Sequence, residues 1–285
     1  MFATSTQRSH WMFNSLDELD EIRAKTNQRA GDLLTAKEEL YMVRSYLVNL
    51  KEFCRKFMPP MRKSVIATAF MYMKRFYLQE SCMEYHPRNI GVTCAYLACK
   101  VDEFNVSIDQ FIKNVKGDCR KAQQTVLSNE LLLMKKLRFH LTVHLPNRAV
   151  EGYLIDLRAR YYPAKDKTDL MLIEIEDYLD KAMFTDACFL FTPSQIALAA
   201  VCFGADKCGV DLASYLSDII FDDQPAALER FQSVCASIQQ LIERDLQDSP
   251  GKDVIKKIEK KMQESASAAT NAAGGATTPA AAVAT

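Results

Sequence analysis

The sequence lacks the short motifs that mark several large classes of enzyme. Nine glycines in 285 residues leave little material for a Gly-rich phosphate-binding loop, and none is present. The GxSxG motif of serine hydrolases and the HExxH motif of zinc proteases are also absent. These absences argue against the corresponding activities, and they favour a protein that acts by binding.

Metal ligands are scarce and badly spaced. There are four histidines and nine cysteines, and no CxxC pair occurs. His140 and His144 have a spacing that places two ligands on one face of a helix, but Pro146 follows closely, so we expect them to pack in a loop. The cysteines lie mostly in apolar runs without an evident base partner, which indicates reduced, buried thiols in a cytosolic or nuclear protein. We therefore expect no metal and no cofactor.

Neither charge nor hydropathy points to nucleic acid or to a membrane. The 36 basic and 36 acidic residues give a formal net charge of zero, which provides no broad attraction to phosphate backbones or anionic lipid. No uncharged stretch approaches the roughly 20 residues that span a bilayer. Residues 1–12 contain no apolar signal core, so we do not expect secretion.

Helical signals dominate the chain, and strand alternation is scarce. Thr35 with Glu38 forms a capping-box pattern before an apolar, periodic segment, and Ser107 with Gln110 forms another. Apolar spacing, caps and prolines predict helices over residues 16–29, 40–57, 61–79, 87–100, 107–115, 121–137, 148–160, 168–185, 193–207, 210–220, 226–246 and 252–263.

The segment HPRNIGVTCAYLACKVDEF (86–104) is apolar on every side. Residues 91–99 carry no charge, and the run ends abruptly at Lys100. A helix that is apolar all round must be buried all round, so we predict the central helix of a bundle. The pattern recurs 106 residues later, because HPRNIGVTCAYLACK aligns with TPSQIALAAVCFGAD (192–206) and Pro87 matches Pro193.

This internal repetition predicts an all-α fold of two tandem five-helix repeats with extra N- and C-terminal helices. Each central segment has two predicted helices before it and two after it. The predicted divisions are an N-terminal segment with a helix (1–34), a first repeat (35–143), a second repeat (144–247), a C-terminal helix (248–264) and a disordered Ala/Thr-rich tail (265–285).

Tandem five-helix repeats whose first central helix ends in LACKVDEF resemble the cyclins, so the predicted repeats are expected to be cyclin boxes. The more specific pieces, MEYHPR (83–88) and TPSQIALAA (192–200), resemble the branch of that family that serves the CDK-activating kinase. The weaker pieces are HWMF (10–13), KRFYL (74–78), LACKVDEFNVS (97–107) and EGYLIDLRARY (151–161). The Ala/Thr-rich tail departs from the charged tails of some relatives.

The resemblance implies a partner-binding face on the first repeat. In the family, the lysine that ends the central helix pairs with a glutamate on the fifth helix, and these residues map onto Lys100 and Glu130. The apolar contacts around this pair map onto Leu97, Val101, Leu131, Met134 and Leu141. From the residues alone, the favoured reading of Lys100 is a basic side chain that ends the helix and complements its dipole.

The resemblance also implies an activating subunit of a protein kinase that is not itself an enzyme. The expected partners are the catalytic subunit of the CDK-activating kinase, the ménage-à-trois assembly factor and the transcription and repair factor TFIIH. The expected substrates of the complex are activation loops of cyclin-dependent kinases and the RNA polymerase II C-terminal domain. We expect a nuclear protein without direct contact with nucleic acid or membrane.

Two alternatives stay open. The first is a cyclin C-like subunit of a Mediator kinase, since runs such as KRFYL (74–78) also occur in that branch. The second is a TFIIB-like adaptor with tandem cyclin-type repeats. An adaptor of this kind needs a basic surface that faces DNA, and a net charge of zero does not favour one.

Overall fold

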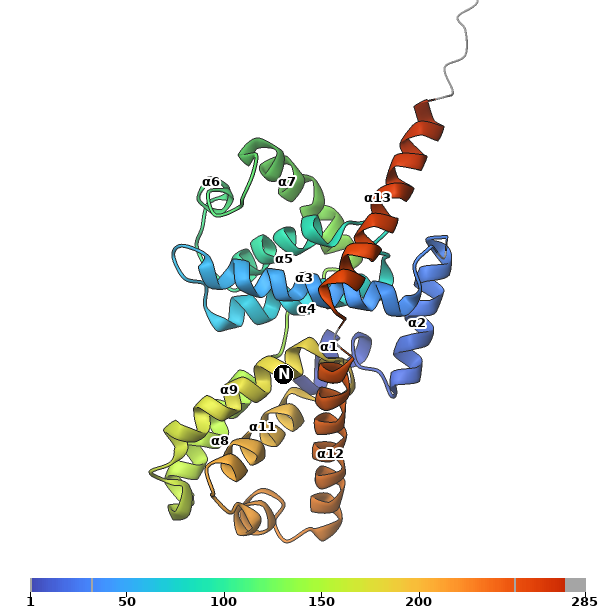
Figure 1. The fold of residues 1–285 in the computed structure, drawn as a ribbon. Coiled ribbons are helices and arrows are strands. Elements are labelled where there is room, and N and C mark those ends of the chain that lie inside the picture. The colour runs from blue at the N-terminus through green and yellow to red at the C-terminus, as the bar shows by residue number, and fades with distance from the viewer. Residues whose placement is uncertain (1, 32, 249, 275–285) are drawn as a thin grey trace, which may run out of the picture.

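The computed structural model describes residues 2–31, 33–248 and 250–274, with side chains up to residue 265, and these residues form helices without strands. Figure 1 shows two helical bodies in tandem, with the N-terminal helices beside them. The N-terminal segment contains α1 (Thr6–His10) and α2 (Leu16–Arg29). The predicted all-α class with two tandem repeats is confirmed.

The first repeat contains the five predicted helices. They are α3 (Ala36–Lys56), α4 (Lys63–Gln79), α5 (Pro87–Val101), α6 (Ile108–Ile112) and α7 (Cys119–Lys136). The second repeat contains α8 (Asn147–Arg160), α9 (Thr168–Phe184), the short α10 (Ala187–Leu190), α11 (Pro193–Lys207), a π-helix (Tyr215–Ile220) and α12 (Pro225–Gln247).

Helix starts follow the predicted capping chemistry. Thr35 accepts a hydrogen bond from the backbone of Glu38, whose side chain accepts one from the Thr35 backbone. The same reciprocal pair forms at Ser107 and at Thr192. Each capping box satisfies backbone N–H groups that the first helical turn leaves without partners. The local sequence therefore sets where α3, α6 and α11 begin.

The central position of α5 is confirmed. The helix packs against α3, α4 and α7, and all residues from Thr93 to Cys99 are buried. Small residues let the neighbours approach closely, and Ala98 is fully buried. In the second repeat α11 occupies the matching place between α8, α9 and α12. A Cβ atom added at Gly204, which aligns with Ala98, would lie 2.7 Å from Ile175, so this contact requires glycine.

One predicted helix of the second repeat starts later than expected and is partly of another type. The pattern predicts a helix over 210–220, whereas residues 213–220 are helical and Tyr215–Ile220 form a π-helix. Gly209 has a left-handed φ of 61°, and the Asp211 side chain accepts a hydrogen bond from the Ala213 backbone at 2.8 Å. Such local side-chain bonds compete with helix formation.

The C-terminal helix is longer than predicted. Helix α13 runs from Lys252 to Gly274, so the expectation of a disordered tail is wrong for residues 265–274, while residues 275–285 lie outside the described part of the chain. Alanine has the highest helix propensity, which allows the helix to continue after its apolar stripe has ended. Ile258 and Met262 are buried against the first repeat, and Figure 1 shows α13 crossing α3 and extending past it.

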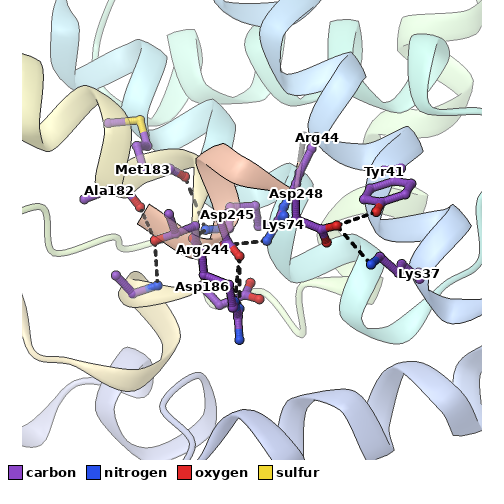
Figure 2. Close-up of polar contacts among 12 residues, drawn as sticks. Lys37, Tyr41, Arg44, Lys74, Ala182, Met183, Asp186, Arg244, Asp245 and Asp248 are labelled. Atoms are coloured by element: carbon purple, nitrogen blue, oxygen red, sulfur yellow. Dashed lines mark hydrogen bonds and ion pairs between the residues drawn. The ribbon is translucent and has the colours of Figure 1, made fainter. Parts of the chain in front are cut away.

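Polar contacts join α3 of the first repeat to the end of α12. Arg44 forms an ion pair with Asp245 at 2.6 Å, and both side chains are largely buried. Asp248 accepts a hydrogen bond from Tyr41 at 2.8 Å and pairs with Lys37 at 2.9 Å, as Figure 2 shows. These contacts fix the second repeat, and the start of α13, against the first helix of the first repeat.

A second set of contacts joins α4 to the end of α9. Lys74 is buried, and its Nζ donates to the backbone carbonyls of Met183 (3.3 Å) and Thr185. Asp186, next in the chain, pairs with Arg23 of α2 at 2.7 Å. Arg23 and Lys74 thus hold the N-terminal segment and both repeats together. No helix in the described part of the chain combines the length and apolar character that crossing a bilayer requires.

Candidate partner-binding surface

Lys100 and Glu130 meet at the surface of the first repeat. Lys100 lies on the last turn of α5, where the buried helix reaches solvent, and Glu130 lies in the middle of α7, which packs against α5. The Lys100 Nζ atom is 2.6 Å from Glu130 Oε1 and 4.8 Å from the centre of the Tyr96 ring. The structure therefore brings together the two charged residues that the sequence singled out.

The pair is a surface feature, and its role in folding is small. The side chains of Lys100 and Glu130 are 46% and 16% exposed. An ion pair this open to solvent contributes about 0–1 kcal/mol to stability. The same charges are worth more when a partner excludes water from them, because electrostatic interactions strengthen as the local dielectric constant falls.

Exposed apolar side chains flank the pair on α7. Leu131 is 51% exposed, and Leu127 and Met134 share its face of the helix because they lie four and three residues away. A neighbouring face of α7, with Val126 and Leu133, is buried. Val101 and Leu141 are half-buried against the core of the first repeat.

Leu97 does not belong to the exposed surface. Only 2% of this residue is accessible, and it packs within the core of the first repeat. The prediction places Leu97 in direct contact with a partner, whereas in the structure it lies beneath the surface that carries Lys100. On a helix that is apolar all round, sequence spacing does not reveal which apolar side chains reach solvent.

Two further exposed apolar residues, one on α7 and one in the turn after it, were not among the predicted site residues. Helical spacing could have identified Leu127, because it lies four residues before Leu131 and therefore on the same face of α7. Phe139 is 58% exposed, and both it and Arg138 have left-handed φ angles, 57° and 54°. The Phe139 N–H donates to the Met134 carbonyl at 2.9 Å, which closes the turn after α7. The sequence carries no clear signal for this turn, since non-glycine residues rarely adopt such angles.

The histidines that follow α7 contact the N-terminal segment. Trp11 donates from Nε1 to His140 Nδ1 at 3.2 Å, and the rings of Phe2 and His144 lie edge to face. Burial and neighbouring cations lower the pKa of His144.

No cluster of three metal-ligating side chains occurs among the described residues. Burial also raises the pKa of the Cys82 and Cys94 thiols far above the ordinary value, which makes these cysteines poor nucleophiles.

Two family descriptions match the chain in tandem. Residues 12–142 match the cyclin N-terminal domain, and residues 145–243 match the cyclin C-terminal domain. Each description covers one of the two helical repeats. The fold and these matches define a protein built from paired cyclin domains.

Relatives narrow the class further. Cyclin-H of Xenopus laevis is 42% identical over 77% of this chain and 73% of its own length. Cyclin-H1-1 of Arabidopsis thaliana is 33% identical over 77% of this chain and 75% of its own length. Among solved structures, the CAK complex from Chaetomium thermophilum bound to ATP-gamma-S contains a chain that matches with a TM-score of 0.80 and 26% identity, covering 92% of this chain and 87% of that one. The chain therefore belongs to the cyclin family, in its cyclin H branch.

Proposed function

We propose that this protein is the regulatory subunit of a CDK-activating kinase and has no catalytic chemistry of its own. The observation that carries the proposal is the Lys100–Glu130 pair, set among exposed apolar side chains on one face of the first repeat. Similarity to cyclin H relatives and to a chain of a CAK complex supports the identity of the kinase.

The proposed mechanism is a shift in the conformational population of the kinase. Phosphoryl transfer by a protein kinase requires an internal lysine–glutamate ion pair, which forms only when the kinase C-helix is correctly placed. A subunit that binds the active placement more tightly increases its population. A shift from 1:99 to 99:1 requires a difference of ~5.5 kcal/mol in affinity for the two states.

The polar and apolar parts of the surface have different tasks in this proposal. Leu127, Leu131 and Phe139 supply area for hydrophobic burial and exclude water from the central pair. Within that dry contact, Lys100 and Glu130 present polar groups to the kinase. Removing either residue leaves the other charge buried and unpaired in the complex, which costs about 2–5 kcal/mol of binding energy.

The wider assembly follows from the same reasoning. We assign the ménage-à-trois assembly factor and TFIIH as further partners, and the nucleus as the site of action. Within that assembly the kinase would phosphorylate activation loops of cyclin-dependent kinases and the RNA polymerase II C-terminal domain. A polymerase-directed kinase acts on a nuclear substrate, which is what supports the localisation.

The test uses Lys100→Ala and Glu130→Ala in an activation assay with purified kinase catalytic subunit and assembly factor. Both variants should weaken activation by roughly 30-fold or more, the equivalent of at least 2 kcal/mol. Circular dichroism and the melting curve should hardly change, because the pair contributes little to folding. If both variants activate as well as the unmodified protein, the assignment of the site is wrong.

A further inference from the structure

The turn that follows Lys100 is held from outside its helix by Arg62. Arg62 precedes the first residue of α4, and its side chain reaches the end of α5. The Nη2 atom donates to the backbone carbonyl of Asp102 at 2.8 Å and to that of Glu103 at 3.1 Å. The last carbonyls of a helix lack partners within the helix and form the negative end of its dipole, so a guanidinium there satisfies both needs.

The backbone of this turn needs such support. Glu103 has a φ of 52°, in the left-handed region that favours glycine. The turn closes through the Phe104 N–H, which donates to the Cys99 carbonyl at 2.8 Å. A non-glycine residue keeps this conformation when its surroundings hold it there. The carbonyl that Arg62 binds at 3.1 Å is that of Glu103 itself.

A second contact from α4 acts on the same turn. The buried Thr68 hydroxyl donates to the Asp102 carboxylate at 3.2 Å, so Asp102 is held through its side chain as well as through its carbonyl. Arg62 is exposed and forms no ion pair among the described residues. Its two side-chain hydrogen bonds both end on this turn, two and three residues beyond Lys100.

We propose that Arg62 is a positioning residue for Lys100. By fixing the carbonyls of Asp102 and Glu103, it keeps the last turn of α5 in the geometry in which Lys100 bonds Glu130 and faces the kinase. Without Arg62 the left-handed turn relaxes, the end of α5 frays, and Lys100 and Val101 lose their fixed place. This inference rests on the proposed function, since it concerns how the same surface is held ready.

A different reading of the contact is that Arg62 merely stabilises the first repeat. The two readings differ in how Arg62 depends on Lys100. If Arg62 acts through Lys100, substituting Arg62 has no further effect on activation once Lys100 is removed. If Arg62 contributes independently, its substitution weakens activation by the same factor with or without Lys100. A double-mutant cycle therefore separates them.

The experiment titrates the full chain against purified kinase catalytic subunit and assembly factor, and measures the concentration that gives half-maximal activation. Arg62→Ala should raise that concentration roughly tenfold, the usual scale for losing hydrogen bonds from a charged donor. In the Lys100→Ala background, Arg62→Ala should change it by less than about twofold. Arg62→Lys, which keeps a cationic donor, should recover part of the loss.

The matched control is Arg55→Ala. Arg55 is an exposed arginine at the end of α3 whose side chain bonds Asp180 of α9. It should activate like the unmodified protein, and melting curves for every variant report whether folding is intact. The inference is overturned if Arg62→Ala activates as well as the unmodified protein. It is also overturned if Arg62→Ala raises the half-maximal concentration tenfold in the Lys100→Ala background. In either case the proposed function stands. An unimpaired Lys100→Ala variant overturns the proposed site and the role of Arg62 together.

Discussion

Individual side chains on the α7 face differ in what they contribute to folding and to binding. Leu131 is half-exposed, so it contributes little to the core, yet it lies one residue from Glu130 on the surface assigned to the kinase. Leu133, two residues further along, is fully buried. In the proposed complex, leucine contacts the partner at position 131, whereas at position 133 it packs in the core of the first repeat.

Leu131→Asp tests this division at the residue scale. A carboxylate placed in the dry part of an interface loses its hydration without gaining a partner, so kinase binding should weaken by at least about 2 kcal/mol, or some 30-fold. The free energy of unfolding should stay within about 0.5 kcal/mol of the value for the unmodified protein, as for other exposed positions. Equilibrium binding to the kinase subunit and thermal unfolding are the two measurements.

The control is Leu170→Asp. Leu170 is 60% exposed on α9 of the second repeat, so the substitution introduces the same charge at a similar exposure. It should leave kinase affinity unchanged. Equal losses of affinity from Leu131→Asp and Leu170→Asp would show that the α7 face is not the specific contact.

At the scale of elements, the central helix of the first repeat is packed too tightly to accept a larger residue. Ala98 is fully buried on α5, which contacts α3, α4 and α7. Ala98→Leu should destabilise the protein by roughly 1–3 kcal/mol, because the extra carbons force neighbouring side chains from their preferred rotamers. Urea unfolding measures the change.

The comparison variant is Ala159→Leu, at an exposed position on α8. It should change the free energy of unfolding by less than about 0.5 kcal/mol. An unchanged unfolding curve for Ala98→Leu would contradict the buried, central position of α5.

Elements were more predictable from the sequence than surfaces were. The capping box at Thr35 and the burial of α5 follow from local rules of capping and apolar periodicity, although α3 begins at Ala36 and not at the predicted residue 40. The exposure of Phe139 follows from a left-handed turn, and the burial of Leu97 follows from how neighbouring helices cover α5. The first is a local turn without a sequence signal and the second is a tertiary effect, so apolar periodicity indicated neither. The Lys100–Glu130 contact was predicted only from the family resemblance. The residues alone were also consistent with a lysine that simply ends a helix.

For the molecule as a whole, buried ion pairs join the N-terminal segment and the repeats. Arg23 of α2 and Asp186, which precedes α10, lie 2.7 Å apart and are largely inaccessible to solvent. Burial disfavours the Asp186 carboxylate, but the Arg23 charge and hydrogen bond outweigh it and hold the pKa of Asp186 below its ordinary value. The pair therefore links acid stability to the packing of the N-terminal segment against the second repeat.

Asp186→Asn should lower the free energy of unfolding by about 3 kcal/mol at pH 7, because it removes the buried counter-charge of Arg23 and leaves only the exposed Asp20 to pair with that guanidinium. A carboxyl with a lowered folded pKa stabilises the protein above the unfolded value of about 3.9, and the stabilisation is lost as the pH falls through the folded pKa. The difference in the free energy of unfolding between the unmodified protein and Asp186→Asn should therefore narrow below about pH 4. Denaturant titrations at pH 7 and at acidic pH measure it, and a gap independent of pH would contradict this account.

The most direct test of the central claim is a kinase assay with purified components. The protein is mixed with the catalytic subunit of the CDK-activating kinase and its assembly factor, and phosphate transfer to a polymerase C-terminal-domain peptide is followed. A parallel reaction uses the Mediator kinase subunit, the partner expected for a cyclin C-like protein. The account predicts a large rise in rate with the first kinase and none with the second. No rise with the first kinase, from protein that is folded and helical, would contradict it.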